Sequence, residues 1–136
     1  MVRPVVHGEM ALAGVSRPAT KDDIPVAKDL LDTLKENRKN CVGMAANMIG
    51  QKICIIVFDN GGKYMTMLNP EITEASGEYE TEEGCLSLSG TRKTRRFEKI
   101  TVKYQTLALA EKTGSFSGFP AQIIQHEIDH CRGKLI

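Results

Sequence analysis

The chain has 136 residues, 41% of them hydrophobic and 26% charged, and its 18 basic and 17 acidic side chains leave a formal net charge of +1. This composition predicts a single globular domain over residues 1–136, and it excludes collagen-like and disordered chains. The balanced charge favours neither a stable nucleic-acid complex nor an anionic membrane as partner. We find no apolar stretch of membrane-spanning length and no signal sequence, so we expect a cytoplasmic protein whose four cysteines are reduced.

The first predicted element follows an irregular segment of about twenty residues, in which glycine and proline interrupt any regular pattern. Apolar residues then recur at helical spacing over residues 24–34, with Asp22 or Asp23 as N-cap and Asn37 near the end. This pattern predicts an amphipathic helix packed on the core. Residues 41–51 follow and contain glycines that permit close approach of the backbone. Segments of this kind often line functional sites.

Strands are predicted in the middle of the chain. Residues 53–58 and 63–68 are two apolar runs joined by the turn sequence Asp-Asn-Gly-Gly, which predicts a hairpin. Asn69-Pro70 is expected to start a turn. Over residues 100–104 apolar and polar side chains alternate, which predicts a half-buried antiparallel strand.

The last predicted element is a helix. Residues 114–118 are expected to form a loop, and Phe119-Pro120 then opens a helix that continues to about Cys131 and ends near Gly133.

This helix contains the pattern HExxH. Its spacing places the rings of His126 and His130 on one face, about 6 Å apart, as two ligands of one metal require. Glu127 lies beside them, where its carboxylate can reach a water on the metal. Gln125 and Asp129 are candidates to hold the free ring nitrogen of a ligand histidine. The alternative is a polar surface helix without a metal.

A catalytic site of this kind needs a third protein ligand and leaves one position open. His7 lies in the irregular segment and is expected to be solvated. Cys54 is expected to be a small buried hydrophobe, Cys131 points about 100° around the helix from the histidines, and Cys41 is a weak candidate. Cys85 is favoured, because the preceding glycine lets the backbone approach a metal.

Three segments resemble the signature motifs of the peptide deformylase family: residues 43–50 (GMAANMIG), 83–87 (EGCLS) and 125–130 (QHEIDH). The resemblance covers nearly the whole chain. It implies an α+β fold, with antiparallel strands around a central C-terminal helix that carries HExxH and an N-terminal helix packed outside. It also implies an enzyme, a metal-dependent hydrolase that removes the formyl group from nascent or short N-formylmethionyl peptides and that contacts the ribosome only transiently.

The resemblance assigns roles to individual residues. It implies that Cys85, His126 and His130 bind one divalent metal, Fe(II) natively, with Zn, Ni or Co as alternatives. Glu127 is implied as general base and then general acid, and the backbone N–H of Leu86 as an oxyanion donor.

Four further positions are implied to bind substrate. They are Gly43, Met44, Asn47 and Ile128. Met44 and Ile128 would border the pocket for the methionine side chain, with plain core packing as the alternative.

The first motif departs from the family pattern. The family has Pro-Gln where this chain has Asn47-Met48, and the glutamine amide is implied to be the second oxyanion donor. Met48 cannot donate a hydrogen bond. One hypothesis is that the Asn47 amide takes the place of the missing glutamine as oxyanion donor, with Gln51 as a less favoured substitute. The other hypotheses are a hydrolase of weak or altered specificity and a non-catalytic metal-binding protein, which would need a fourth ligand.

A basic run, residues 92–96, follows the cysteine motif. It is predicted to be an exposed charged strand, with a peptide-orienting or RNA-facing surface as the alternative.

Overall fold

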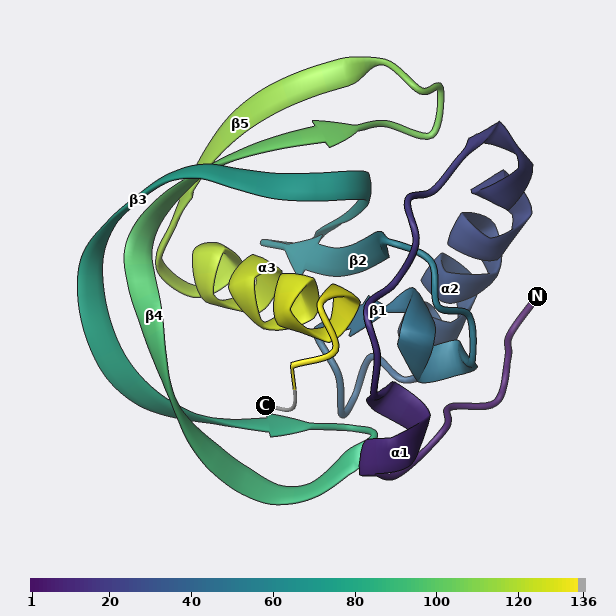
Figure 1. Ribbon diagram of the computed structural model, residues 1–136, viewed down its shortest axis with the longest axis horizontal. Helices are drawn as coiled ribbons and strands as arrows, with labels where there is room; N and C mark the ends of the chain where they lie inside the picture. Colours follow the sequence, from purple (N-terminus) through teal and green to yellow (C-terminus); the bar gives the residue numbers. More distant parts are fainter. Residues whose placement is uncertain (135–136) are drawn as a thin grey trace.

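The computed structural model describes residues 1–134, and it shows a curled five-stranded sheet wrapped around a central helix (Figure 1). All neighbouring strands are antiparallel, in the order β1-β2-β3-β4-β5. The elements are α1 (Glu9–Leu12), the 3₁₀ helix η1 (Lys21–Asp23), α2 (Ile24–Glu36), β1 (Gly43–Ala45), the 3₁₀ helix η2 (Ala46–Ile49), β2 (Ile55–Asn60), β3 (Lys63–Cys85), β4 (Leu88–Gln105), β5 (Glu111–Ser117) and α3 (Gly118–Cys131). This architecture confirms the predicted α+β fold. Residues 135 and 136 of the predicted domain lie outside the described part.

The first predicted helix is confirmed as α2. Asp23 is its N-cap residue, and Asn37 follows its last residue. Pro25 lies in the first turn, where backbone N–H groups have no partner within the helix, so the N–H that proline lacks costs no hydrogen bond. None of the described helices is both long and apolar enough to cross a membrane.

Strand β2 is buried on both faces and joins two hydrophobic clusters. Ile55 and Val57 face the cluster that includes the inner side of α2, whereas Ile56 and Phe58 face the cluster around α3. Successive side chains of a strand point to opposite faces, so this short continuous apolar run lets one strand separate the two helices. The hairpin predicted from the same run is confirmed, because β2 and β3 pair from Asn60↔Lys63 to Ile55↔Leu68.

The prediction of a turn at Asn69-Pro70 was wrong, because β3 continues through it. The strand accommodates both residues in an irregularity where its register with β4 shifts between Leu68 and Glu71. Asn69 adopts a left-handed conformation (φ 52°), which asparagine tolerates, and its side chain bonds both the N–H and the C=O of Ala19 at 2.7 and 3.0 Å. Such an irregularity increases the twist of the strand. It also accommodates Pro70, because proline has no N–H to donate to a neighbouring strand. The β3–β4 pair can therefore curve around α3, as Figure 1 shows.

The predicted loop at residues 114–118 was also wrong, because most of it belongs to strand β5. Strand β5 pairs with β4 from Lys99↔Ser117 to Gln105↔Glu111. Gly114 fits this strand, because a Cβ there would lie 3.1 Å from the Phe116 ring, and the ring would have to shift to relieve the close contact.

Helix α3 confirms the last predicted helix and lies at the centre of the fold. Its end is fixed by Gly133 in a left-handed conformation (φ 72°), whose N–H donates to the His130 carbonyl at 3.0 Å. A Cβ at Gly133 would lie 2.5 Å from the Gly14 carbonyl oxygen, so only glycine fits there.

The N-terminal segment is less irregular than predicted. It forms the one-turn helix α1 and binds the backbone of three distant segments through the bonds Val6 N–H to Met48 O, Gly8 N–H to Ser87 O and Ser16 N–H to Cys131 O, all at 2.8 to 2.9 Å. These segments include or adjoin the motif residues, so the N-terminal segment helps to hold the site together.

Candidate active site

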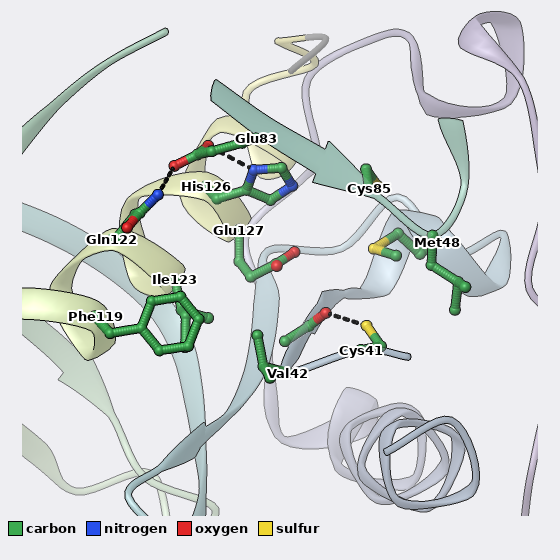
Figure 2. A pocket seen from close by; sticks show the side chains of 12 residues that line it. Cys41, Val42, Met48, Glu83, Cys85, Phe119, Gln122, Ile123, His126 and Glu127 are labelled. Carbon is green, nitrogen blue, oxygen red and sulfur yellow. Dashed lines mark hydrogen bonds and ion pairs between the residues drawn. The ribbon is translucent and has the colours of Figure 1, made fainter. Parts of the chain in front are cut away.

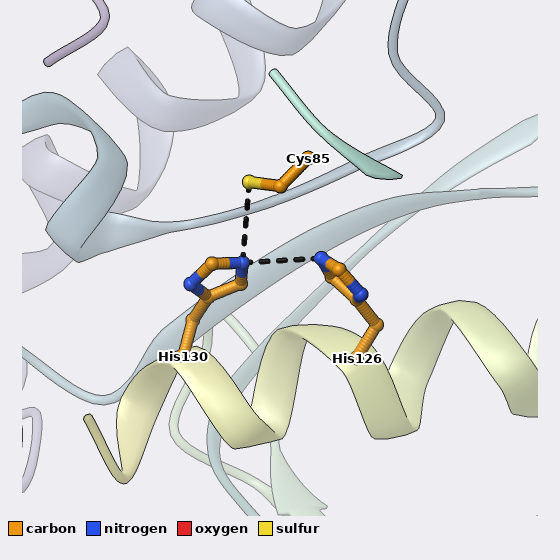
Figure 3. A group of neighbouring side chains, drawn as sticks. All are labelled: Cys85, His126 and His130. Atoms are coloured by element: carbon orange, nitrogen blue, oxygen red, sulfur yellow. Dashed lines mark hydrogen bonds between the residues drawn. The ribbon is translucent and has the colours of Figure 1, made fainter. Parts of the chain in front are cut away.

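The structure brings the three predicted metal ligands together (Figure 3). Cys85 comes from the last residue of β3, and His126 and His130 lie one turn apart on α3. The Cys85 Sγ is 3.4 Å from His130 Nε2, the two histidine Nε2 atoms are 3.1 Å apart, and one ligand atom from each residue lies within 4.8 Å of the others. One sulfur and two imidazole nitrogens that converge in this way fit a single divalent metal such as Fe(II), Zn, Ni or Co.

Glu83 orients His126, a role that the sequence analysis missed. Its Oε1 lies 2.8 Å from His126 Nδ1, which leaves Nε2 free to face the other ligand atoms. Burial would raise the pKa of the Glu83 carboxyl, but hydrogen bonds with His126, Arg96 and Gln122 outweigh it and lower that pKa to about 2. Glu83 is therefore a charged acceptor that favours ligation through His126 Nε2. A signal was present, since Glu83 and Cys85 are two residues apart on one strand.

Gln125 and Asp129 do not hold a ligand imidazole, so the prediction for both was wrong. The Gln125 amide bonds the N–H and C=O of Phe97, each at 2.8 Å, and ties α3 to β4. The Asp129 carboxylate accepts a hydrogen bond from Arg96 Nη1 at 2.7 Å.

Arg96 was predicted to lie on an exposed basic run, and it is instead 3% exposed. Its guanidinium donates to Glu83 at 2.6 to 3.2 Å and to Asp129. It therefore joins the carboxylate that bonds His126 to a second carboxylate on α3. The neighbouring Arg95 is on the outer face, where it pairs with Glu78 at 3.1 Å. Acidic side chains of β3 thus face part of this basic run.

Glu127 is buried beside the ligand group, and its Oε1 has no hydrogen-bond partner among residues 1–134. Burial raises the pKa of its carboxyl to about 7. Gly43 makes room for it, because a Cβ at Gly43 would lie 3.0 Å from Glu127 Oε2 and 2.6 Å from Ile123 Cγ2. The carboxyl is therefore free to exchange a proton with a bound molecule near the metal ligands.

A cavity of about 110 Å³ opens beside this carboxyl (Figure 2). Cys85, His126 and Glu127 line one part of it. The rest of its wall is mostly apolar and includes Val42, Met48, Leu86, Phe119 and Ile123. Cys41 also lines it, and its thiol donates to the Gly43 carbonyl at 2.9 Å rather than joining the ligand group.

Three of the predicted substrate-binding residues do not line this cavity. Met44 and Ile128 are buried in the two hydrophobic clusters, which matches the core-packing alternative. Asn47 is buried as well, and its amide donates to the backbone carbonyls of His130 and Leu12. Gly43 does line the cavity, whereas His7 is exposed elsewhere.

Comparisons with known proteins agree with this geometry. The family model for polypeptide deformylase matches residues 3–136. A peptide deformylase of Clostridium beijerinckii is 49% identical over 136 residues, which cover the whole of both chains. A crystal structure of a peptide deformylase from Legionella pneumophila superposes with a TM-score of 0.89 at 33% identity, covering 99% of this chain and 83% of that one. A Met-Ala-Ser-bound peptide deformylase from Acinetobacter baumannii gives 0.88 at 32% identity, covering 99% and 97%. The chain belongs to the peptide deformylase family.

Proposed function

We propose that this protein is a metal-dependent hydrolase that removes the formyl group from N-formylmethionyl peptides. One observation carries the proposal: an unpartnered Glu127 carboxyl lies beside a cysteine and two histidines, at the end of a mostly apolar cavity. Three protein ligands are the number that a catalytic site uses when it keeps a position open. In the described part of the chain, no fourth Cys, His, Asp or Glu joins this group.

Cys85, His126 and His130 would hold one divalent metal, which we propose to be Fe(II), with Zn, Ni or Co as substitutes. When bound, such an ion acts as a Lewis acid toward water and toward a carbonyl oxygen. The thiol of Cys85 suits these metals better than Mg²⁺ or Ca²⁺, which prefer oxygen ligands.

Glu127 would move the proton in the reaction. A pKa of about 7 lets its carboxylate accept a proton from the attacking water and then give it to the leaving amine. We assign the N–H of Leu86, which follows Cys85 at the turn into β4, to the oxyanion that develops on the formyl oxygen.

An extended peptide would bind along the free edge of β1. The Val42 carbonyl accepts a bond from Asp59 N–H on β2, so the polar backbone groups of Gly43 face away from the sheet. A peptide N–H can then replace the Cys41 thiol at the Gly43 carbonyl. The methionine side chain would occupy the apolar part of the cavity.

The free edge of β1 and the apolar cavity support a peptide as partner. We propose that it is a nascent or short formylmethionyl peptide, met in the cytoplasm near the ribosome. Ribosome contact would be transient, because the ion pair between Arg95 and Glu78 offsets part of the positive charge on the basic stretch of β4.

A second candidate is a deformylase-like hydrolase with a low rate or altered acyl specificity. Met48 favours it, because this side chain lines the cavity where the family pattern has a donating glutamine. Loss of one oxyanion donor costs about 10² to 10³ in rate.

The test is hydrolysis of formyl-Met-Ala-Ser by anaerobically prepared Fe(II) protein. We expect formate release, its loss in Glu127→Gln with metal content unchanged, and loss of metal in Cys85→Ser. Glu98→Gln, on the exposed surface of β4, is the matched control and is expected to keep full activity. No formate from metal-loaded wild-type protein, with release from acetylated or other acylated amines instead, would favour the second candidate.

A further inference from the structure

The Cys41 thiol covers a main-chain acceptor on the free edge of the sheet. Its Sγ donates to the Gly43 carbonyl at 2.9 Å, two residues further along the chain. Gly43 begins the edge strand β1, and its polar groups face away from β2, because the Val42 carbonyl accepts the bond from the Asp59 N–H. The thiol therefore bonds the carbonyl that an added strand would use.

The side chain of Cys41 is held at this place by packing. It is partly buried against the hydrophobic cluster that includes the inner side of α2. It also lines the cavity, and Figure 2 shows the thiol and its hydrogen bond at the cavity wall. Glu127, whose buried Oε1 has no partner among residues 1–134, lines the same cavity. A ligand that fills this cavity therefore contacts both the thiol and the carboxyl.

The thiol is protonated at neutral pH. Burial, followed by the charge of Glu127, raises the pKa of Cys41 to about 12. The group is therefore an S–H donor and not a thiolate. An S–H group is a weak donor compared with a peptide N–H, so a peptide can displace it from the carbonyl. The thiol then loses its bond to Gly43, and this loss reduces the net affinity for the peptide.

We propose that Cys41 is a specificity-determining residue that competes with the substrate peptide for the Gly43 carbonyl. In the empty site the thiol covers this acceptor. A ligand that offers a backbone N–H replaces the thiol there, whereas a ligand without such a donor leaves the carbonyl to the thiol. The competition thus selects for ligands with an extended main chain. This inference rests on the proposed function, because it needs a peptide along the edge of β1.

The test measures binding without turnover. Isothermal titration calorimetry gives the Kd of Met-Ala-Ser, the product of formyl-Met-Ala-Ser, for zinc-loaded wild type, Cys41→Ala and Cys41→Ser. Steady-state hydrolysis of formyl-Met-Ala-Ser then gives kcat and KM for the same proteins. Cys54→Ala is the matched control, because Cys54 is also a partly buried free cysteine but does not line the cavity.

Cys41→Ala removes the competing donor and should bind Met-Ala-Ser about two- to fivefold more tightly, as expected for one weak hydrogen bond. Cys41→Ser replaces the S–H with a stronger O–H donor and should bind more weakly by a similar factor. KM should follow Kd while kcat stays within about twofold of wild type, because the thiol is displaced in both the substrate complex and the transition state. Cys54→Ala should bind as wild type does.

Equal or weaker binding by Cys41→Ala would overturn the inference, since truncation of a merely structural residue is expected to weaken binding. Raman spectroscopy tests the wild type in case the variant does not fold. The S–H stretching band of Cys41 should move to higher frequency when Met-Ala-Ser saturates the zinc-loaded protein, and unchanged S–H bands would also overturn the inference.

Two further outcomes separate this inference from the proposed function. A wild type that does not bind Met-Ala-Ser would refute the peptide site on β1, and the competition at Gly43 with it. Binding of Met-Ala-Ser without release of formate from formyl-Met-Ala-Ser would refute only the proposed reaction.

Discussion

Glu83 Oε1 lies 2.8 Å from His126 Nδ1, so a residue of strand β3 determines which nitrogen of a helix residue faces the metal. Glu83 is two residues before the ligand Cys85 on the same strand. One short segment of β3 therefore supplies both the ligand Cys85 and the carboxylate that orients the ligand His126.

Replacing this carboxylate should weaken metal binding. We expect Glu83→Gln to raise the zinc dissociation constant about 10- to 100-fold, because the neutral amide is a weaker acceptor for the His126 ring N–H. Chelator competition measures this change. Glu82→Gln, at the exposed neighbouring position, should bind zinc as wild type does, and equal weakening in both variants would argue against a specific role for Glu83.

Loss of the Arg96 guanidinium should lower stability strongly. Arg96→Met leaves the carboxylates of Glu83 and Asp129 buried without their cation, and we expect a loss of about 3 to 5 kcal/mol in the free energy of unfolding. Urea denaturation of the metal-free proteins measures it. Arg95→Met removes a guanidinium whose side chain is 69% exposed and should cost less than about 1 kcal/mol. Similar losses in both variants would contradict the buried role.

Restoring a donor at position 48 should raise the rate. We expect Met48→Gln to increase kcat on formyl-Met-Ala-Ser by at least tenfold with a smaller change in KM, because an oxyanion donor acts mainly in the transition state. Met48→Leu keeps the apolar character and size and should not raise kcat. An unchanged kcat in Met48→Gln would mean that this wall of the cavity does not face the oxyanion.

Stability should fall in acid as Asp23 becomes protonated. The hydrogen bond from Arg17 is the main reason that the pKa of Asp23 is lowered from 3.8 to about 2 in the folded chain. A lowered pKa adds stability at pH values above 4, and this contribution is lost as the pH falls from about 4 to about 2.

Urea denaturation in the presence of a chelator checks this expectation. The free energies of unfolding of wild type and Asp23→Asn should differ most above pH 4 and converge near pH 2. A difference that stays constant over this range would show that the carboxylate charge contributes nothing.

The sequence predicted those parts of the site that depend on short spacings. The i, i+4 pair His126 and His130 and the motif residue Cys85 are identified by local pattern, and they converge as expected. Arg96 was missed because it was read as part of a charged run. The alternation of buried residues at Ile100, Val102 and Tyr104 does not continue unbroken to residue 96, because Glu98 is exposed, so the local pattern did not mark Arg96 as buried.

Other features depend on the tertiary structure and could not be predicted from local pattern. Asn69-Pro70 has the composition of a turn, and only the pairing of β3 with β4 makes it an irregularity within a strand. Asn47 was expected to face the substrate, but the end of helix α3 supplies carbonyl acceptors from a segment more than eighty residues away.

The central position of α3 has a consequence for how the chain folds. The strands that surround this helix precede it in the sequence, so they leave the ribosome before the segment that fills their interior has been synthesised. Most of the native contacts must then form between residues distant in sequence, which slows folding and leaves apolar strand surfaces exposed in the meantime. We therefore expect the metal site and the hydrophobic core to form together, in one late cooperative step.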